Sequence, residues 1–260
     1  QPPFLCISLP LSSDGRFMFR RIFATALFAG FLGGLGISVV HEFTTTPIIL
    51  HAEQFESKSG ATDQKRSSIQ SSLLFLAHGK TGGDAAKDGG PAWGPANGWE
   101  RTLFTTIANI ITGVGFALIL VACFSLSSSS VNGRTGVIWG MAGFGVMSLA
   151  PALGLPPEVP GTLTADLVPR QSWWFLCVAA TALGLWMLVF RKGVVWVVAG
   201  IALMVLPHIV GAPQPARIGG AVPPELAGHF AAASLVTSAI FWSLLGWLSG
   251  TFWQRFETRS

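Results

Sequence analysis

SWWFLCVAATALGLWMLVFRKGVVWVVAGIALMVLPHIV, which is residues 172–210, decides the fold of this chain. It contains two apolar runs, Ser172–Phe190 and Gly193–Val210, separated only by Arg191-Lys192. About 20 helical residues cross a hydrocarbon core of ~30 Å, and each run approaches that length. Because a cation at the centre of such a helix costs about 2.5–3.5 kcal/mol, we expect two membrane helices joined by a turn at Arg191-Lys192.

The composition of the whole chain agrees with this assignment. Of its 260 residues, 50% are hydrophobic and only 11% are charged, whereas soluble domains carry about 25% charged residues. The mean hydropathy is +0.57. These values exclude a soluble globular domain, a disordered chain and a collagen-like fibre. The three cysteines, Cys6, Cys123 and Cys177, are too far apart for a disulfide framework or a CxxC metal site.

Four further stretches lack Asp, Glu, Lys and Arg over a comparable length. We therefore predict an all-α, polytopic membrane bundle with six transmembrane helices, at about Ile22–Val40, Thr102–Leu126, Thr135–Leu155, Ser172–Phe190, Gly193–Val210 and His229–Trp253. The fifth stretch is the shortest and ends near Pro207, so a bundle of five helices is the alternative.

The distribution of Lys and Arg predicts the orientation of the bundle. With the N-terminus inside the cell, eight of the sixteen cations lie in inner segments, two in short outer loops and six in the loop between His41 and Arg101. Cations close to membrane helices are retained on the cytoplasmic side, so we expect both ends of the chain there. The net charge of +4 reflects this pattern, and no basic cluster indicates nucleic acid as a partner.

We divide the chain into four parts. Residues 1–17 are interpreted as an N-terminal extension, and residues 18–56 as the first transmembrane helix followed by a short outer helix. Thr46 and Pro47 suit the start of that helix, and Ile48, Ala52 and Phe55 repeat along it at helical spacing. Residues 57–97 are rich in Ser, Gly, Lys and Asp and are expected to form a flexible outer linker. Residues 98–260 hold the other five membrane helices.

Small residues recur four apart on several predicted membrane helices. This spacing lets two helix backbones approach closely in lipid, so these positions are candidates for helix contacts. They are Ala26/Gly30/Gly34, Gly136/Gly140 and Gly246/Gly250.

Polar stripes run along two of the helices, with Asn109 and Thr112 on one and Ser234 and Thr237 on the other. Both helices run inward, so the two pairs are expected at a similar depth. There they form either hydrogen bonds between helices or a hydrated path for an ion. The lack of Asp and Glu in the middle of every span favours the hydrogen bonds.

Histidines and carboxylates collect on one side of the predicted bundle. All five histidines and ten of the twelve carboxylates fall outside, although only Lys and Arg set the orientation. Imidazole with carboxylate suits a divalent first-row metal such as Co, Ni, Cu or Zn better than Mg or Ca. An ion-capturing outer mouth is one interpretation, and ordinary solvated side chains at helix ends are the other. The candidate metal ligands are His41, Glu42, His51, Glu53, His208, Glu225 and His229.

The motifs of common enzymes are incomplete in this chain. His41-Glu42-Phe43-Thr44-Thr45 has threonine where a zinc protease needs its second histidine, and Gly79-Lys80-Thr81 lacks the glycine of a phosphate-binding loop. No GxSxG segment marks a nucleophilic serine. We therefore expect no enzyme, no catalytic residue and no bound cofactor. A membrane enzyme acting on a lipid or pigment is the least favoured hypothesis.

A set of segments resembles the family of proposed cobalt transporter subunits, CbtA, and the likeness covers nearly everything from Met18 onward. The segments are Phe19-Arg20-Arg21-Ile22-Phe23, Thr46–Glu53, Gly98–Thr102, Thr112–Ala117, Ala150–Glu158, Pro207–Pro213, Pro224–Ala227 and Phe230–Ser234. The resemblance implies that cobalt or a similar divalent cation is the transported substrate. It implies a small histidine-bearing partner, CbtB, and five spans, where the hydropathy pattern predicts six.

We therefore predict an integral subunit of a divalent metal (cobalt) uptake transporter in the bacterial inner membrane, with a cytoplasmic N-terminus. The outer His/carboxylate mouth would capture the ion, and Asn109, Thr112, Ser234 and Thr237 would line its pathway. The expected partners are the lipid bilayer and a CbtB-like subunit, with a homo-oligomer left open and no nucleic acid. The alternative is a structural or assembly subunit of a larger membrane complex that moves no metal.

Overall fold

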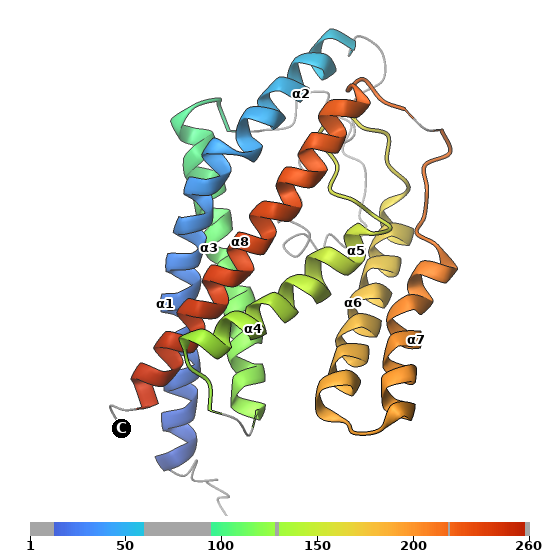
Figure 1. The fold of residues 1–260 in the computed structure, drawn as a ribbon. Coiled ribbons are helices and arrows are strands. Elements are labelled where there is room, and N and C mark those ends of the chain that lie inside the picture. The colour runs from blue at the N-terminus through green and yellow to red at the C-terminus, as the bar shows by residue number, and fades with distance from the viewer. Residues whose placement is uncertain (1–12, 60–94, 128–129, 218, 258–260) are drawn as a thin grey trace, which may run out of the picture.

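Helices account for almost all of the regular structure in the computed structural model, which describes residues 13–59, 95–127, 130–217 and 219–257 (Figure 1). Their order along the chain is α1 (Ser13–Phe43), α2 (Thr45–Ser59), α3 (Trp99–Leu126), α4 (Gly133–Phe144), the π-helix η1 (Gly145–Leu149), α5 (Ala150–Ala152), α6 (Leu167–Phe190), α7 (Val194–Val210) and α8 (Pro224–Glu257).

The predicted all-α membrane bundle is confirmed. Five helical segments are long and apolar enough to cross a membrane, and α4, η1 and α5 together make one of them. They are Phe17–Phe43 within α1, then α3, Gly133–Ala152, α6 and α8. The remaining predicted span, the fifth along the chain, is α7, whose 17 residues rise about 25 Å at 1.5 Å per residue. It runs back along α6 from the Arg191-Lys192 turn, as the sequence predicts (Figure 1).

Several helix boundaries differ from the predicted ones. α8 begins at Pro224 rather than His229, because proline is tolerated in the first turn of a helix. The third span ends at Ala152 and contains the unpredicted π-helix η1. α1 begins at Ser13, so residues 13–17 of the predicted extension are helical. Residues 1–12, and 60–94 of the predicted linker, lie outside the described residues.

Three helix pairs organise the bundle: α1 with α3, α4 with α8, and α6 with α7. α1 also packs on α8, and this contact joins the first two pairs. Alanine, aromatic and leucine side chains form the core at this contact, including Ala26, Ala29, Phe241 and Leu245. The α6–α7 hairpin lies to one side (Figure 1). It contacts η1 and α5, and the Phe190 ring at the end of α6 packs on Trp139 of α4.

Glycines allow close backbone approach in each of the three pairs. A side chain on Gly34 would place its Cβ 2.5 Å from the Cα of Ile110 in α3, and one on Gly140 would collide with the carbonyl of Trp242 in α8. In the hairpin, a Cβ on Gly184 would lie 2.6 Å from the carbonyl oxygen of Gly200. The predicted small-residue positions on α1, α4 and α8 therefore lie at helix contacts.

A buried arginine ties α1 to α8 at the other end of the bundle from α2. Arg21 donates Nε and Nη2 hydrogen bonds to the carbonyl of Trp253 at 3.1 and 2.8 Å. Nη2 also lies 2.8 Å from Oε2 of Glu257, and the guanidinium carbon lies 3.7 Å from the centroid of the Trp253 ring. We call this contact the Arg21 clasp.

Candidate metal-capture site

α2 and the start of α8 meet at one end of the bundle. Thr44, between α1 and α2, donates its hydroxyl to the carbonyl of Val40 at 2.6 Å, at the point where the chain turns. The apolar face of α2 then packs on α8 through Ile48, Ala52 and Phe230. These contacts hold the polar side chains of the two helices close together.

A hollow of about 300 Å³ lies between α2 and the start of α8. Its lining comes from both helices and from the residue before α8: His51, Phe55, Pro223, Glu225, Leu226 and His229. We call it the α2–α8 hollow. His51 is exposed and packs on Phe55 with ring centroids 5.4 Å apart.

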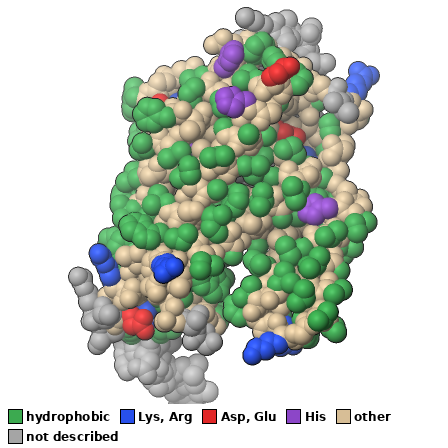
Figure 2. Space-filling view, in the orientation of Figure 1, with side chains coloured by type: hydrophobic (Ala, Val, Ile, Leu, Met, Phe, Trp, Pro, Cys, Tyr) green, Lys and Arg blue, Asp and Glu red, His purple; other side chains and the backbone are tan. Residues whose placement is uncertain are grey.

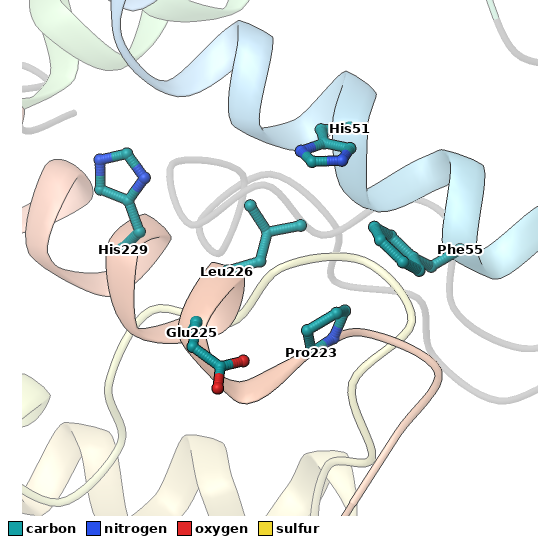
Figure 3. Close-up of a pocket in the computed structure, with 6 residues that line it drawn as sticks. All are labelled: His51, Phe55, Pro223, Glu225, Leu226 and His229. Atoms are coloured by element: carbon teal, nitrogen blue, oxygen red, sulfur yellow. The ribbon is translucent and has the colours of Figure 1, made fainter.

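The close-up of the α2–α8 hollow shows how its polar groups are directed (Figure 3). Leu226 is drawn between the rings of His51 and His229, and the carboxylate of Glu225 points away from both rings. His229 and Glu225 are exposed. The hollow thus holds two imidazoles and a carboxylate on accessible side chains, which need rotamer changes to bind one ion together.

The other predicted ligands lie elsewhere in the structure. Nδ1 of His41 lies 3.4 Å from Nδ2 of Asn109 in α3, and Glu42 is exposed at the end of α1. Glu53 pairs with Arg101, with Oε1 2.6 Å from Nη2. His208 lies in the α6–α7 hairpin. Among the described residues, no three His, Cys, Asp or Glu side chains are grouped to hold a metal ion.

His78, the fifth histidine, lies outside the described residues.

The predicted pathway residues mainly make contacts that hold helices together. Asn109 is buried and donates Nδ2 to Oγ of Ser38 in α1 at 3.0 Å. Thr237 is buried in α8, and its hydroxyl donates to the carbonyls of Ala233 and Ser234 in the same helix, each at 3.0 Å. Ser234 is also buried, whereas Thr112 is partly exposed.

Two polar groups near this end of the bundle were missed in the sequence analysis. Ser38 lies three residues before His41, hence on the same helix face, and this spacing could have indicated that it joins Asn109 and His41. Glu158 pairs with Arg170, with Oε2 2.7 Å from Nη2. Burial raises the pKa of the Glu158 carboxyl above its ordinary value, and the charge of Arg170 acts in the opposite direction.

The α2–α8 hollow can supply nitrogen and oxygen ligands for a divalent first-row cation. Two imidazoles and one carboxylate form the ligand set of several zinc sites, with a further position left for water. Here the three side chains are exposed and separate, so the hollow suits weak, reversible binding at the surface better than a permanent structural metal.

Comparison with known proteins gives the family. No curated protein and no solved structure matches this chain. The sequence profile of the family described as "Probable cobalt transporter subunit (CbtA)" matches residues 19–254. This match spans every helix from the start of the first membrane span to the last turns of α8, and the chain therefore belongs to the CbtA family of probable cobalt transporter subunits.

Proposed function

We propose that this protein captures cobalt, or a similar divalent cation, at the α2–α8 hollow and delivers it inward across the bacterial inner membrane. The observation that carries the proposal is the meeting of His51, Glu225 and His229 around one hollow, in a chain of a cobalt transporter family. These residues lie far apart in the sequence and are brought together by the packing of α2 on α8.

The arrangement of cations supports an outward-facing hollow. Figure 2 shows Lys and Arg gathered mainly at the end of the molecule where α1 begins, with apolar side chains across the middle. That end includes Arg21, the Arg191-Lys192 turn and Arg255 near the end of α8. Cations are retained on the cytoplasmic side, so this arrangement supports an N-terminus inside and a hollow outside.

A polar cluster near the end of α1 supports a direction of transfer. His41 precedes the turn into α2, and it contacts Asn109, which in turn contacts Ser38. We assign these three side chains as the next contacts of the ion, ahead of Thr112, Ser234 and Thr237 further along the proposed pathway. The membrane potential supplies about 4.6 kcal/mol to a dication at 100 mV, which suffices to drive inward movement without an ATPase.

The partner follows from the family description, which names a subunit. We propose a small histidine-bearing membrane protein of the CbtB type, which would concentrate the ion near the hollow. Effective concentration at a second weak site raises overall binding without any new contact in either protein.

The test is uptake of radioactive cobalt by cells that express this chain with its partner. Replacing His51 and His229 together with alanine should lower initial uptake at least tenfold at low cobalt, because both imidazole ligands are lost from the hollow. Glu42→Gln is the matched control, since this exposed side chain is not among those lining the hollow. Unchanged uptake in the double variant, with normal protein levels, would reject the α2–α8 hollow as the capture site.

A structural or assembly subunit is the second candidate function. It is favoured by the hydrogen bond of Asn109, which joins α3 to α1, and by that of Thr237, which lies within α8. Under this alternative, the double variant keeps normal uptake, and deletion of the chain abolishes uptake only by removing its partner from the membrane. Membrane levels of the partner, measured in the deletion strain, separate the two functions.

A further inference from the structure

A second group of metal-ligating atoms lies where α5, α6 and α7 meet, away from the α2–α8 hollow. Cys177 of α6 is fully buried, and its Sγ lies 3.9 Å from Nε2 of His208 in α7. Trp173 donates Nε1 to the carbonyl of Pro207 at 3.0 Å, and its ring meets the His208 ring edge-on at 5.8 Å. These contacts hold the thiol and the imidazole together across the hairpin.

A buried hydroxyl lies beside the same thiol. Thr181 is one helical turn beyond Cys177, so both side chains share one face of α6. Thr181 is only 3% exposed, yet its hydroxyl has no hydrogen-bond partner among the described residues. Buried polar groups normally have a hydrogen-bond partner, so this oxygen is available to a ligand bound beside the thiol.

The distance between sulfur and nitrogen fits a shared metal ion. Bonds of about 2.3 Å to thiolate and about 2.05 Å to imidazole, at a tetrahedral angle, place the two ligand atoms about 3.6 Å apart. The observed separation of 3.9 Å needs only a small side-chain rotation to reach this value. The pair is therefore close to the geometry of binding before any ion arrives.

An irregular helical turn lies beside the thiol and the imidazole. Ala150 packs on Trp173 and Cys177, and it directly follows the π-helix Gly145–Leu149. Single π-helical turns within α-helices occur frequently at functional sites. His208 is partly exposed, so the imidazole offers the route by which an ion would reach the buried thiol.

We propose that Cys177, Thr181 and His208 form a second binding site, for a thiophilic divalent cation such as Co²⁺. Thiolate and imidazole are the ligands that such ions prefer, the Thr181 oxygen is a third ligand, and water takes the fourth position. When the metal–sulfur bond forms, the S–H bond breaks and its proton passes to solvent water. This site would give the transported ion a soft ligand inside the bundle. Its role in transport rests on the proposed function, whereas metal binding at the site is measured independently of transport.

The experiment is cobalt titration of the purified full-length protein in detergent, followed by absorption spectroscopy. Cobalt bound to thiolate gives a sulfur-to-metal charge-transfer band in the near ultraviolet, which imidazole and carboxylate ligands do not give. We expect the band in the native protein and in Cys123→Ser, the matched control on the exposed face of α3. Cys177→Ser should abolish it, and His208→Gln should weaken cobalt affinity at least tenfold. Thr181→Val tests the third ligand and should also weaken affinity.

A band that is absent from the native protein, or that persists in Cys177→Ser, would overturn this site. Cys177 and His208 would then form only a structural contact between α6 and α7. The variant lacking His51 and His229 separates this result from the capture proposal. It should keep the charge-transfer band while losing uptake. If the variant lacking His51 and His229 loses uptake but no form of the protein shows the band, the capture hollow is supported and the Cys177 site is rejected. If that variant shows the band and has normal uptake, the Cys177 site is supported and the capture hollow is rejected.

Discussion

The Arg21 clasp concentrates several interactions of α1 and α8 on one side chain. Replacing Arg21 with alanine removes both hydrogen bonds to the Trp253 carbonyl, the contact with its ring and the ion pair with Glu257. We expect a loss of about 2–3 kcal/mol in unfolding free energy, because charged hydrogen bonds of buried groups and cation–π contacts each contribute on this scale.

Thermal unfolding in detergent measures the effect of Arg21→Ala. Arg20→Ala is the control, since the neighbouring side chain is exposed, and it should unfold at the wild-type temperature. Equal unfolding temperatures for the two variants would show that the clasp contributes nothing to stability.

The pH dependence of stability should carry a contribution from Glu158. Because burial raises the pKa of its carboxyl, the folded protein binds the proton more tightly than the unfolded chain does. Stability from this group therefore falls as the pH rises from the ordinary carboxyl pKa of about 4.3 through the raised pKa. In Glu158→Gln this decline should disappear.

The test of Glu158 is the unfolding temperature measured over a series of pH values. Glu158→Gln also removes the ion pair with Arg170, which lowers the unfolding temperature at every pH at which the carboxyl is ionised. The quantity to compare is therefore the change of unfolding temperature with pH, and not the unfolding temperature at one pH. Glu42→Gln, at an exposed carboxylate, should keep the wild-type slope. Parallel curves for Glu158→Gln and the wild type would contradict the assignment.

The sequence revealed the chemistry of the candidate ligands but not their grouping. His51, Glu225 and His229 were recognised from their residue types and side of the membrane, and the structure places all three at one hollow. Glu53 was also a candidate, yet it pairs with Arg101 across 48 residues of chain. No local pattern indicates such a partner, because the pairing depends on how α2 and α3 approach each other.

Helix pairs in this bundle depend on glycine surfaces, and the α4–α8 pair gives a clear test. Gly140→Leu would force side-chain atoms into the Trp242 backbone, so we expect destabilisation of about 2 kcal/mol or more. Gly115→Leu is the matched control, because no atom lies within 4 Å of its position. Cross-linking or unfolding temperature reports the separation of the helices, and equal behaviour of both variants would show that close approach is unimportant.

Helices were the most predictable elements, because each is a long apolar run bounded by charges, glycine or proline. The outer helix was also predicted, since Thr46, Pro47 and the spacing of Ile48 and Ala52 are local signals. The π-helix at Gly145–Leu149 was not. This π-helix contacts α6, and it has no local signal comparable to the cap and spacing of the outer helix.

At the scale of the whole molecule, the number of crossings depends on α7. We expect α7 to cross the membrane paired with α6, because Gly184 and Gly200 bring the two backbones together. A cysteine at Lys192 should then react with an impermeant maleimide only from the cytoplasmic side, and a cysteine at Gln214 only from outside. Both labelling patterns are measured in intact cells and inverted vesicles, with the unsubstituted chain as background. Reaction of both positions from one side would show that α7 turns back within the membrane.

The relative positions of the candidate metal ligands in the bundle could not be predicted from the sequence. Hydropathy places His208 at the same membrane face as His51, but the hairpin that carries His208 lies to the side of the α1–α8 contact (Figure 1). The relative position of helices is set by long-range packing, chiefly by glycines on α1, α4 and α8. These glycines were visible in the sequence, whereas their partners were not.

The Arg21 clasp also constrains how the protein is made. Arg21 enters the bilayer with the first helix, while its acceptors at Trp253 and Glu257 leave the ribosome only after every other membrane helix has been synthesised. Until α8 is made, the guanidinium of Arg21 therefore lacks both of these acceptors. The contact closes only after α8 has joined the bundle, so it cannot form in a chain whose synthesis stops before that helix.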